Sequence, residues 1–257
     1  MNSSPLPPRI AITGAAGFLG QRLVECLGQH FPLRLMDVQP ISSEWETRIG
    51  SVSELDDAMA LCEGCSHLVI AHMAPNRPGV YDTPTIPYDV NVKGTANLLH
   101  AAHVHGIKRV VLISSTGVVL GHPTGTFLKT DLPGLPGLGA YCLTKLLQEN
   151  IAEHFHREKG LQISVLRPGY ICDEDSVTDK YGTKRPSVNW QFIDPRDIAD
   201  AVYLSLIHPS LEFEVFYLIG HPDAEQHADI KRTKEFLGWL PKHTFEKYPR
   251  DEEIEAI

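Results

Sequence analysis

Residues 9–20 read RIAITGAAGFLG, an apolar strand that runs into a glycine turn and then into a helix. Gly14, Gly17 and Gly20 recur at every third position of this stretch. Gly14 permits the tight turn, Gly17 lets the backbone approach a diphosphate, and Gly20 lets the helix pack closely on the strand. The unpaired amides at the start of the helix would point at that diphosphate. The stretch therefore predicts a dinucleotide-binding turn.

A second apolar strand at 33–36 ends in Asp37, which completes a strand–helix–strand unit. A carboxylate at this place can accept hydrogen bonds from both hydroxyls of an adenosine ribose, and it repels a 2′-phosphate. We therefore expect NAD as the cofactor in preference to NADP. The alternative is an ordinary glycine-rich turn without a ligand, which the whole unit disfavours.

The chain has 257 residues and a net charge of −9, which fits one substantial core. The acidic balance offers no basic patch for nucleic acid or an anionic membrane. There is no apolar run long enough to span a bilayer, and the first eight residues lack the features of a signal peptide. We therefore expect a cytoplasmic protein, with its five cysteines reduced and with a disordered charged tail at 250–257.

Strand and helix patterns alternate along most of the chain. Strands at 67–71 and 108–114 alternate with helices at 88–105 and 141–159, and the proline-rich segment 75–87 predicts a surface loop. This order predicts an α/β fold, a Rossmann-type doubly wound parallel sheet with a small C-terminal substrate-binding lobe.

The same order divides the chain into two parts. We expect residues 1–166 to form the NAD-binding domain that also carries the catalytic residues. Residues 167–257 would form the small lobe, interleaved with the last elements of the sheet. Ligands of such sheets bind beyond the carboxyl ends of the strands, so the chemistry is expected there.

Tyr141 and Lys145 lie four residues apart, which places a phenol and an ammonium on one face of a helix. A nearby cation favours the phenolate, the form that a general base needs. The polar run Ser114, Ser115 and Thr116 ends a buried strand upstream. Together these residues predict a site for proton transfer.

The motifs resemble, in type, order and spacing, the extended short-chain dehydrogenase/reductase superfamily and its NAD-dependent epimerase/dehydratase group. They are TGAAGFLG at 13–20, Asp37, NVKGT at 91–95, SST at 114–116, the Tyr141 and Lys145 pair, and LRPG at 166–169. The later segments FIDPRDIA at 192–199 and FLGWLP at 236–241 are also similar to that family.

The resemblance implies roles for four residues. Tyr141 is expected as the catalytic acid and base, Lys145 holds the nicotinamide ribose, and Thr116 binds the reacting oxygen. Asn91 matches the position that supports the lysine. A hydride would pass between C4 of nicotinamide and a carbinol carbon of the substrate while Tyr141 moves the proton.

The resemblance also implies two sets of contact residues, although Ser51 and Val52 depart from the usual adenine-contact pair. The expected cofactor residues are Gly14, Ala16, Gly17, Phe18, Leu19, Asp37, Ser51, Val52, Ala71, His72, Met73, Asn91, Ser114, Tyr141, Lys145, Pro168, Gly169 and Ile171. The expected substrate residues are Met73, Ala74, Ser115, Thr116, Tyr170 and Arg185.

The stretch after Lys145 is much shorter than in nucleotide-sugar members and resembles the uronate dehydrogenases. We therefore expect oxidation of a secondary alcohol or lactol of a small sugar or sugar acid, with Arg185 or Lys184 pairing with a substrate carboxylate. One alternative is a nucleotide-sugar epimerase or dehydratase with tightly bound NAD. A further alternative is a non-catalytic dinucleotide-sensing regulator, which the Tyr141 and Lys145 pair disfavours.

Two features are candidate binding sites: the apolar faces of two helices, for a second copy, and two histidine pairs, for a metal. Helices 88–105 and 141–159 carry apolar residues on more than one face, and members of the resembled family pair such helices, so we expect a homodimer. Two histidine pairs lie on these helices, yet no cysteine or carboxylate completes either set. We therefore expect no metal site.

Overall fold

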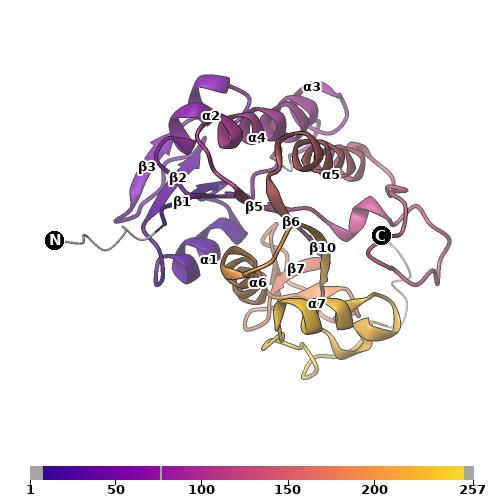
Figure 1. Ribbon diagram of the computed structural model, residues 1–257. Coiled ribbons are helices and arrows are strands. Elements are labelled where there is room, and N and C mark those ends of the chain that lie inside the picture. Colours follow the sequence, from indigo (N-terminus) through magenta and orange to yellow (C-terminus); the bar gives the residue numbers. More distant parts are fainter. Residues whose placement is uncertain (1–7, 76, 252–257) are drawn as a thin grey trace.

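A seven-stranded parallel sheet forms the centre of the computed structural model, which describes residues 8–75 and 77–251 (Figure 1). Every pair of neighbouring strands is parallel. The predicted doubly wound sheet is therefore confirmed. In spatial order the strands are β10 (Phe213–Leu218), β6 (Gln162–Pro168), β5 (Arg109–Ile113), β4 (His67–Ile70), β1 (Ile10–Thr13), β2 (Leu33–Asp37) and β3 (Glu46–Ile49).

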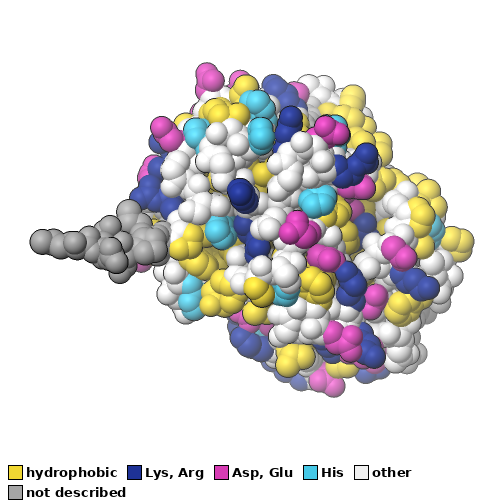
Figure 2. Space-filling view, in the orientation of Figure 1, with side chains coloured by type: hydrophobic (Ala, Val, Ile, Leu, Met, Phe, Trp, Pro, Cys, Tyr) yellow, Lys and Arg dark blue, Asp and Glu magenta, His cyan; other side chains and the backbone are white. Residues whose placement is uncertain are grey.

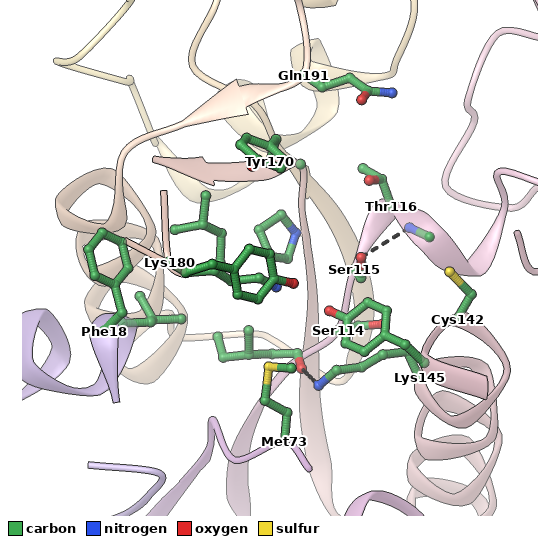
Figure 3. Close-up of a pocket in the computed structure, with 18 of the residues that line it drawn as sticks. Phe18, Met73, Ser114, Ser115, Thr116, Cys142, Lys145, Tyr170, Lys180 and Gln191 are labelled. Atoms are coloured by element: carbon green, nitrogen blue, oxygen red, sulfur yellow. Dashed lines mark hydrogen bonds between the residues drawn. The ribbon is translucent and has the colours of Figure 1, made fainter. Parts of the chain in front are cut away.

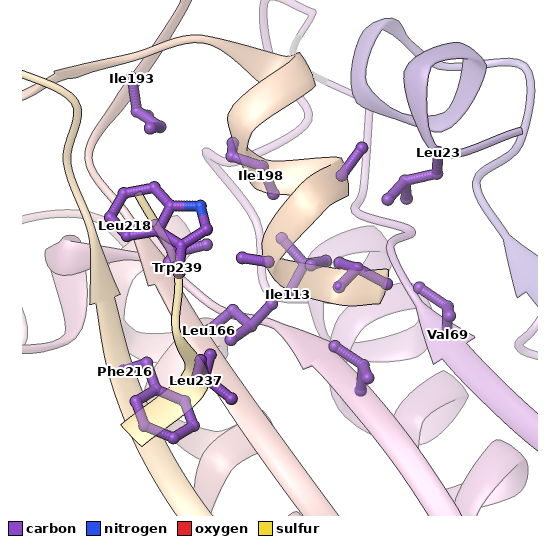
Figure 4. Packing of buried hydrophobic residues seen from close by; sticks show 14 of the residues in the cluster. Leu23, Val69, Ile113, Leu166, Ile193, Ile198, Phe216, Leu218, Leu237 and Trp239 are labelled. Atoms are coloured by element: carbon purple, nitrogen blue, oxygen red, sulfur yellow. The ribbon is translucent and has the colours of Figure 1, made fainter. Parts of the chain in front are cut away.

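Helices cover both faces of the sheet (Figure 1). One apolar core joins the sheet to α1 (Phe18–Leu27), α6 (Pro195–Ile207) and α7 (Ile230–Leu237). Figure 4 shows part of this core, where Trp239 packs near Leu218 and Leu237. A second core joins the other face to α2 (Leu55–Cys62), α4 (Gly94–Val104) and α5 (Ala140–Lys159). Because both faces are buried, the central strands are apolar at nearly every position.

The helix predicted at 88–105 is two elements instead of one, and a third precedes it. A short turn of helix, α3 (Thr85–Pro87), leads into a π-helix, η1 (Tyr88–Lys93), and only then does α4 begin. The expectation of a loop up to residue 87 is therefore wrong for its last three residues, because proline fits the first turn of a helix. The helix predicted at 141–159 is confirmed as α5, which starts one residue earlier.

A small three-stranded sheet lies beyond the carboxyl end of β6. It consists of β8 (Thr178–Asp179), β7 (Tyr170–Asp173) and β9 (Phe192–Ile193). Strands of two residues leave no periodic pattern in a sequence, so this sheet was not predicted. It lies next to the cavity described below.

The surface in view mixes charges of both signs. Figure 2 shows acidic, basic and histidine side chains interspersed over this face, with apolar side chains gathered toward the edge where segment 121–139 lies. Three of the exposed apolar residues in that segment are Phe127, Leu135 and Leu138.

All five cysteines are free thiols. Over the described ranges, no helix combines the length and the apolar character needed to cross a bilayer. The expectations for the first residues and for most of the charged tail fall on 1–7 and 252–257, which lie outside the described part of the chain.

Asp197 anchors the C-terminal segment to the sheet-packed helix α6. Its buried carboxylate accepts hydrogen bonds from the backbone amides of Lys242 and His243, each at 3.0 Å, and from the His243 ring at 3.0 Å. The indole of Trp239 donates to the Asp197 carbonyl at 2.8 Å. One helical residue thus holds the whole 239–243 stretch.

Replacing Asp197 by alanine is expected to lower the free energy of unfolding by about 2 to 4 kcal/mol, because two partly buried amides and the His243 ring lose their acceptor. The matched control is Asp200→Ala on the same helix, where a partly exposed carboxylate pairs with Lys242. That change should cost at most about 1 kcal/mol. Urea unfolding followed by circular dichroism measures both, and equal losses would contradict the anchoring role.

Candidate active site

A cavity of about 1230 Å³ opens at the carboxyl ends of the central strands. Gly14, Ala71, Ser114 and Gly169 line it, and each directly follows a strand of the large sheet, namely β1, β4, β5 and β6. This is the place where doubly wound sheets bind ligands. The volume exceeds that of a typical pocket for one small molecule, so it suits a dinucleotide together with a small substrate.

The glycine turn forms one wall of the cavity. Gly14 has φ +70°, and a Cβ there would lie 2.9 Å from the carbonyl oxygen of Ala71. A Cβ on Gly20 would lie 2.1 Å from the Gly14 carbonyl oxygen. Helix α1 begins after Gly17 without a side-chain cap and without an acidic residue in its first turn. Its first amides are therefore left for an anion, which fits the diphosphate of NAD.

Asp37 lies at the end of β2, next to the glycine turn. One carboxylate oxygen accepts from the backbone amide of Ala16 at 3.1 Å and the other from that of Gln39 at 3.0 Å. Each oxygen of a carboxylate can accept a second hydrogen bond, so the group can still bind ribose hydroxyls. The contact with Ala16 ties two of the expected cofactor residues together.

Of the expected cofactor and substrate contact residues given as two sets above, most line the cavity, but six do not. Those six are Ala16, Asp37, Ser51, Val52, His72 and Asn91. Val52 packs against Gly94, where an added Cβ would lie 2.5 Å from its methyl group, and the Ser51 hydroxyl accepts from the Ser53 amide at 3.2 Å. The structure thus gives these two side chains local packing contacts.

The His72 ring binds other parts of the protein and does not line the cavity. Its Nδ1 lies 3.1 Å from the Thr13 hydroxyl, and its Nε2 lies 3.1 Å from the Val90 carbonyl oxygen. Burial lowers the pKa of His72 to about 3, so the ring stays neutral. It joins the end of β1 to the π-helix η1 behind the cavity wall.

The expected catalytic residues meet at one side of the cavity. Tyr141 comes from the first turn of α5, Lys145 follows one turn later, and Thr116 begins the 3₁₀ helix η2 (Thr116–Val118) after β5. Figure 3 shows Lys145 beside the end of β5, where its ammonium donates to the Ile113 carbonyl at 2.8 Å. Neighbouring Ser115 also lines the cavity and accepts from the Gly117 amide at 3.1 Å.

Lys145 is almost completely buried. Burial lowers the pKa of Lys145 to about 7, and the positive charge of Lys180 adds to this effect, whereas Glu149 opposes it. The ammonium is therefore close to its titration point near neutral pH.

Asn91 contacts helix α5 at the residue before Lys145. Its side-chain oxygen accepts from the Ala74 amide at 2.7 Å, and its amide nitrogen donates to the Thr144 hydroxyl at 2.9 Å. Asn91 thus contacts the residue before Lys145 and the cavity wall, and it joins the π-helix to both.

A buried ionic network adjoins the expected catalytic residues, and it was not predicted. The Ser114 hydroxyl donates to Glu149, and Arg167 binds the same carboxylate through two nitrogens at 3.0 and 2.7 Å. Arg167 also donates to the Tyr217 hydroxyl at 3.0 Å. The available signals were an arginine inside an apolar strand and a glutamate four residues after Lys145.

Arg185 and Tyr170 also line the cavity, and both contact the buried Asp179. Arg185 lines the cavity as expected, but its guanidinium contacts the Tyr170 hydroxyl and lies 3.1 Å from the buried Asp179 carboxylate. Burial raises the pKa of Tyr170 to about 12. Lys184, the other expected partner of a carboxylate, is exposed and does not line the cavity.

Lys180 also lines the cavity and was not predicted. Its ammonium lies 5.2 Å from the ring centre of Tyr141 and 5.1 Å from that of Tyr181. The sequence offers three basic residues between 180 and 185, and only the fold distinguishes which of them face the cavity.

Comparison with known proteins agrees with this geometry. The NAD dependent epimerase/dehydratase family matches residues 10–175. L-arabinose 1-dehydrogenase (NAD(P)(+)) of Haloferax volcanii is 29% identical over 91% of this chain and 96% of its own. N-acetyl-alpha-D-glucosaminyl-diphospho-ditrans,octacis-undecaprenol 4-epimerase of Escherichia coli O157:H7 is 32% identical over 89% of this chain and 72% of its own.

A solved structure of uronate dehydrogenase from Agrobacterium tumefaciens, a mutant complexed with NAD, is also similar. It is 25% identical, has a TM-score of 0.78, and is matched over 93% of this chain and 86% of its own. The resemblance seen in the sequence motifs is thereby confirmed. The chain belongs to the NAD dependent epimerase/dehydratase family.

Proposed function

We propose that this protein is an NAD-dependent dehydrogenase that oxidises a secondary alcohol or lactol of a small sugar or sugar acid. The observation that carries the proposal is that Tyr141, Lys145 and Thr116 line the same cavity as the glycine turn. The similarity to L-arabinose 1-dehydrogenase over nearly the full length of both chains supports this reaction class.

The residues of the glycine wall fit NAD. The amides at the start of α1 would bind the diphosphate, and Asp37 would bind the adenosine ribose in preference to a 2′-phosphate. Pro168, Gly169 and Ile171 line the cavity near the catalytic residues and would contact the nicotinamide. When bound, NAD supplies the hydride acceptor.

The remaining chemistry falls to side chains of this chain. Thr116 or Ser115 would hold the substrate hydroxyl, and Tyr141, as phenolate, would take its proton as the carbon is oxidised. In the opposite direction Tyr141 would return that proton. Lys145 lies one helical turn away and would hold the nicotinamide ribose.

An epimerase that regenerates NAD in each turnover is the second candidate. The 32% identity to the undecaprenyl-linked sugar 4-epimerase favours it. Net release of NADH separates the two reactions, since an epimerase returns the hydride to its substrate. A dinucleotide sensor without catalysis would not need Tyr141, Lys145 and Thr116 together at the cavity.

We also propose the division of labour expected above, with residues 1–166 binding NAD and 167–257 shaping the substrate side. Tyr170 and Arg185, both on the cavity wall, support this. Five free thiols support a cytoplasmic location, where cysteines stay reduced.

We further propose a homodimer in which two copies pair through α4 and α5. The two helices lie side by side (Figure 1). On α5, Leu143 is exposed, and Leu147 follows it one turn later on the side opposite the buried Lys145. This leaves an apolar stripe that a second copy could cover.

Tyr141→Phe is expected to lower kcat at least about a hundredfold, because the proton acceptor is lost. NAD affinity should stay within about threefold, since binding uses other contacts. NADH absorbance with sugars and sugar acids measures the first quantity, and calorimetry measures the second. Tyr203→Phe, remote from the cavity, is the control. Undiminished turnover in Tyr141→Phe would contradict the mechanism.

Lys145 should make the stability of the NAD-free protein depend on pH. Its pKa is about 7 when folded and 10.5 as the ordinary value, so the unfolded chain holds one more proton between these limits. Stability from this group therefore rises with pH across that window, by up to about 1.4 kcal/mol per unit. The unfolding free energy of wild type minus that of Lys145→Met should increase from about pH 7 to pH 9. A constant difference in urea titrations would contradict a lowered pKa.

Leu147→Glu is expected to convert the dimer into a monomer, because it places a charge on the apolar stripe of α5. Leu240→Glu, an equal change at an exposed site elsewhere, should leave the dimer intact. Sedimentation equilibrium measures the mass of each. A wild-type monomer, or a dimer that survives Leu147→Glu, would rule out this interface.

A further inference from the structure

Three cationic side chains line the cavity, and they differ in what they already bind. Lys145 donates to the Ile113 carbonyl, and under the proposed function it would hold the nicotinamide ribose. Arg185 lies 3.1 Å from the Asp179 carboxylate, so its charge is offset. Lys180 takes part in none of the ion pairs formed between described residues. It is thus a cation of the cavity wall without a carboxylate partner in the described chain.

The environment of Lys180 keeps it charged. Burial lowers its pKa, but the hydroxyl groups of Tyr141 and Tyr181 outweigh burial and raise the pKa of Lys180 overall. Withdrawing a cation from water without a counterion is costly. The half-buried Lys180 therefore attracts an anion to this part of the cavity.

A rigid turn presents Lys180. The Asp179 carboxylate accepts from the amides of Tyr181 and Thr183 at 2.8 and 2.9 Å, and it also binds Arg185 and the Tyr170 hydroxyl. These bonds outweigh burial and hold the pKa of Asp179 below its ordinary value, so it stays charged. Asp179 and Arg185 then act as the support of the turn. Figure 3 shows Lys180 and Lys145 reaching into the cavity from different elements.

We propose that Lys180 binds the carboxylate of the substrate, which makes small sugar acids the preferred substrate class. This inference rests on the proposed function and refines it. A single uncompensated ammonium matches a monoanion, whereas a phosphate dianion would leave negative charge in a cavity that Asp251 also lines. Because Lys180 lies over the ring of Tyr141, an acid held there keeps its reacting hydroxyl near the proton acceptor.

The test compares sugars that differ only in a carboxylate, glucuronate with glucose and galacturonate with galactose. In Lys180→Met, KM for the acids should rise about ten- to a hundredfold, while KM for the neutral sugars stays within about threefold. Lys180→Arg keeps the charge and should keep the preference for acids. Lys159→Met, an exposed lysine at the end of α5, is the control for loss of a charge.

Three outcomes would overturn the assignment. One is an equal loss with acids and neutral sugars, which would show a structural role. Another is an unchanged preference for acids in Lys180→Met. The third requires glucose 6-phosphate as a further substrate: a loss in Lys180→Met confined to that compound would make phosphate, and not carboxylate, the group that Lys180 binds.

Calorimetry of the NAD-loaded protein with the same acids measures the contact without turnover. Suppose that the acids bind the wild type, bind Lys180→Met more weakly, and give no NADH with the wild type. That result would support the role of Lys180 and contradict the proposed dehydrogenase activity. No binding of any acid would overturn the role of Lys180, whatever the activity with neutral sugars.

Discussion

The bidentate pair between Arg167 and Glu149 joins α5, the helix that carries Tyr141 and Lys145, to strand β6 of the large sheet. Both side chains are more than nine-tenths buried, and Ser114 and Tyr217 complete their hydrogen bonds. Removing one partner of such a pair leaves an uncompensated buried charge, which typically costs several kcal/mol. Because Glu149 lies one turn after Lys145 on α5, the pair sets how the phenol and the ammonium meet the end of β5. The position of the proposed chemistry therefore depends on it.

The two walls of the cavity are built by opposite means. The wall formed by the glycine turn depends on the absence of side chains, since a Cβ at Gly14 or Gly20 would collide with backbone. On the side of Tyr141 and Lys145, buried polar side chains are held in place by hydrogen bonds within the protein, as Asn91 and Lys145 show. Such preorganised groups do not have to reorient when a substrate arrives.

The sequence was most informative where chemistry and local structure depend on neighbours in the chain. The glycine turn, the alternation of strands and helices, and the Tyr141 and Lys145 pair are all local patterns, and the fold confirms the first two. It was least informative where contacts come from distant segments. Nothing local indicates that the His72 ring contacts the Thr13 hydroxyl. Nor does anything local indicate that the helix predicted at 88–105 begins as a π-helix. Lys180 and Arg185 are two basic residues of one polar segment, and the sequence does not show which of them is paired. Only the fold shows that Asp179 pairs with Arg185 and not with Lys180.

The most direct test of the central claim follows the hydrogen itself. A sugar acid carrying deuterium at the carbon to be oxidised is incubated with the protein and an excess of NAD, and the reduced cofactor is analysed by mass spectrometry. The account predicts that NADH accumulates over many turnovers and carries one deuterium per molecule. Deuterium that stays in a sugar of altered configuration, with NAD unchanged, would contradict the account and indicate an epimerase.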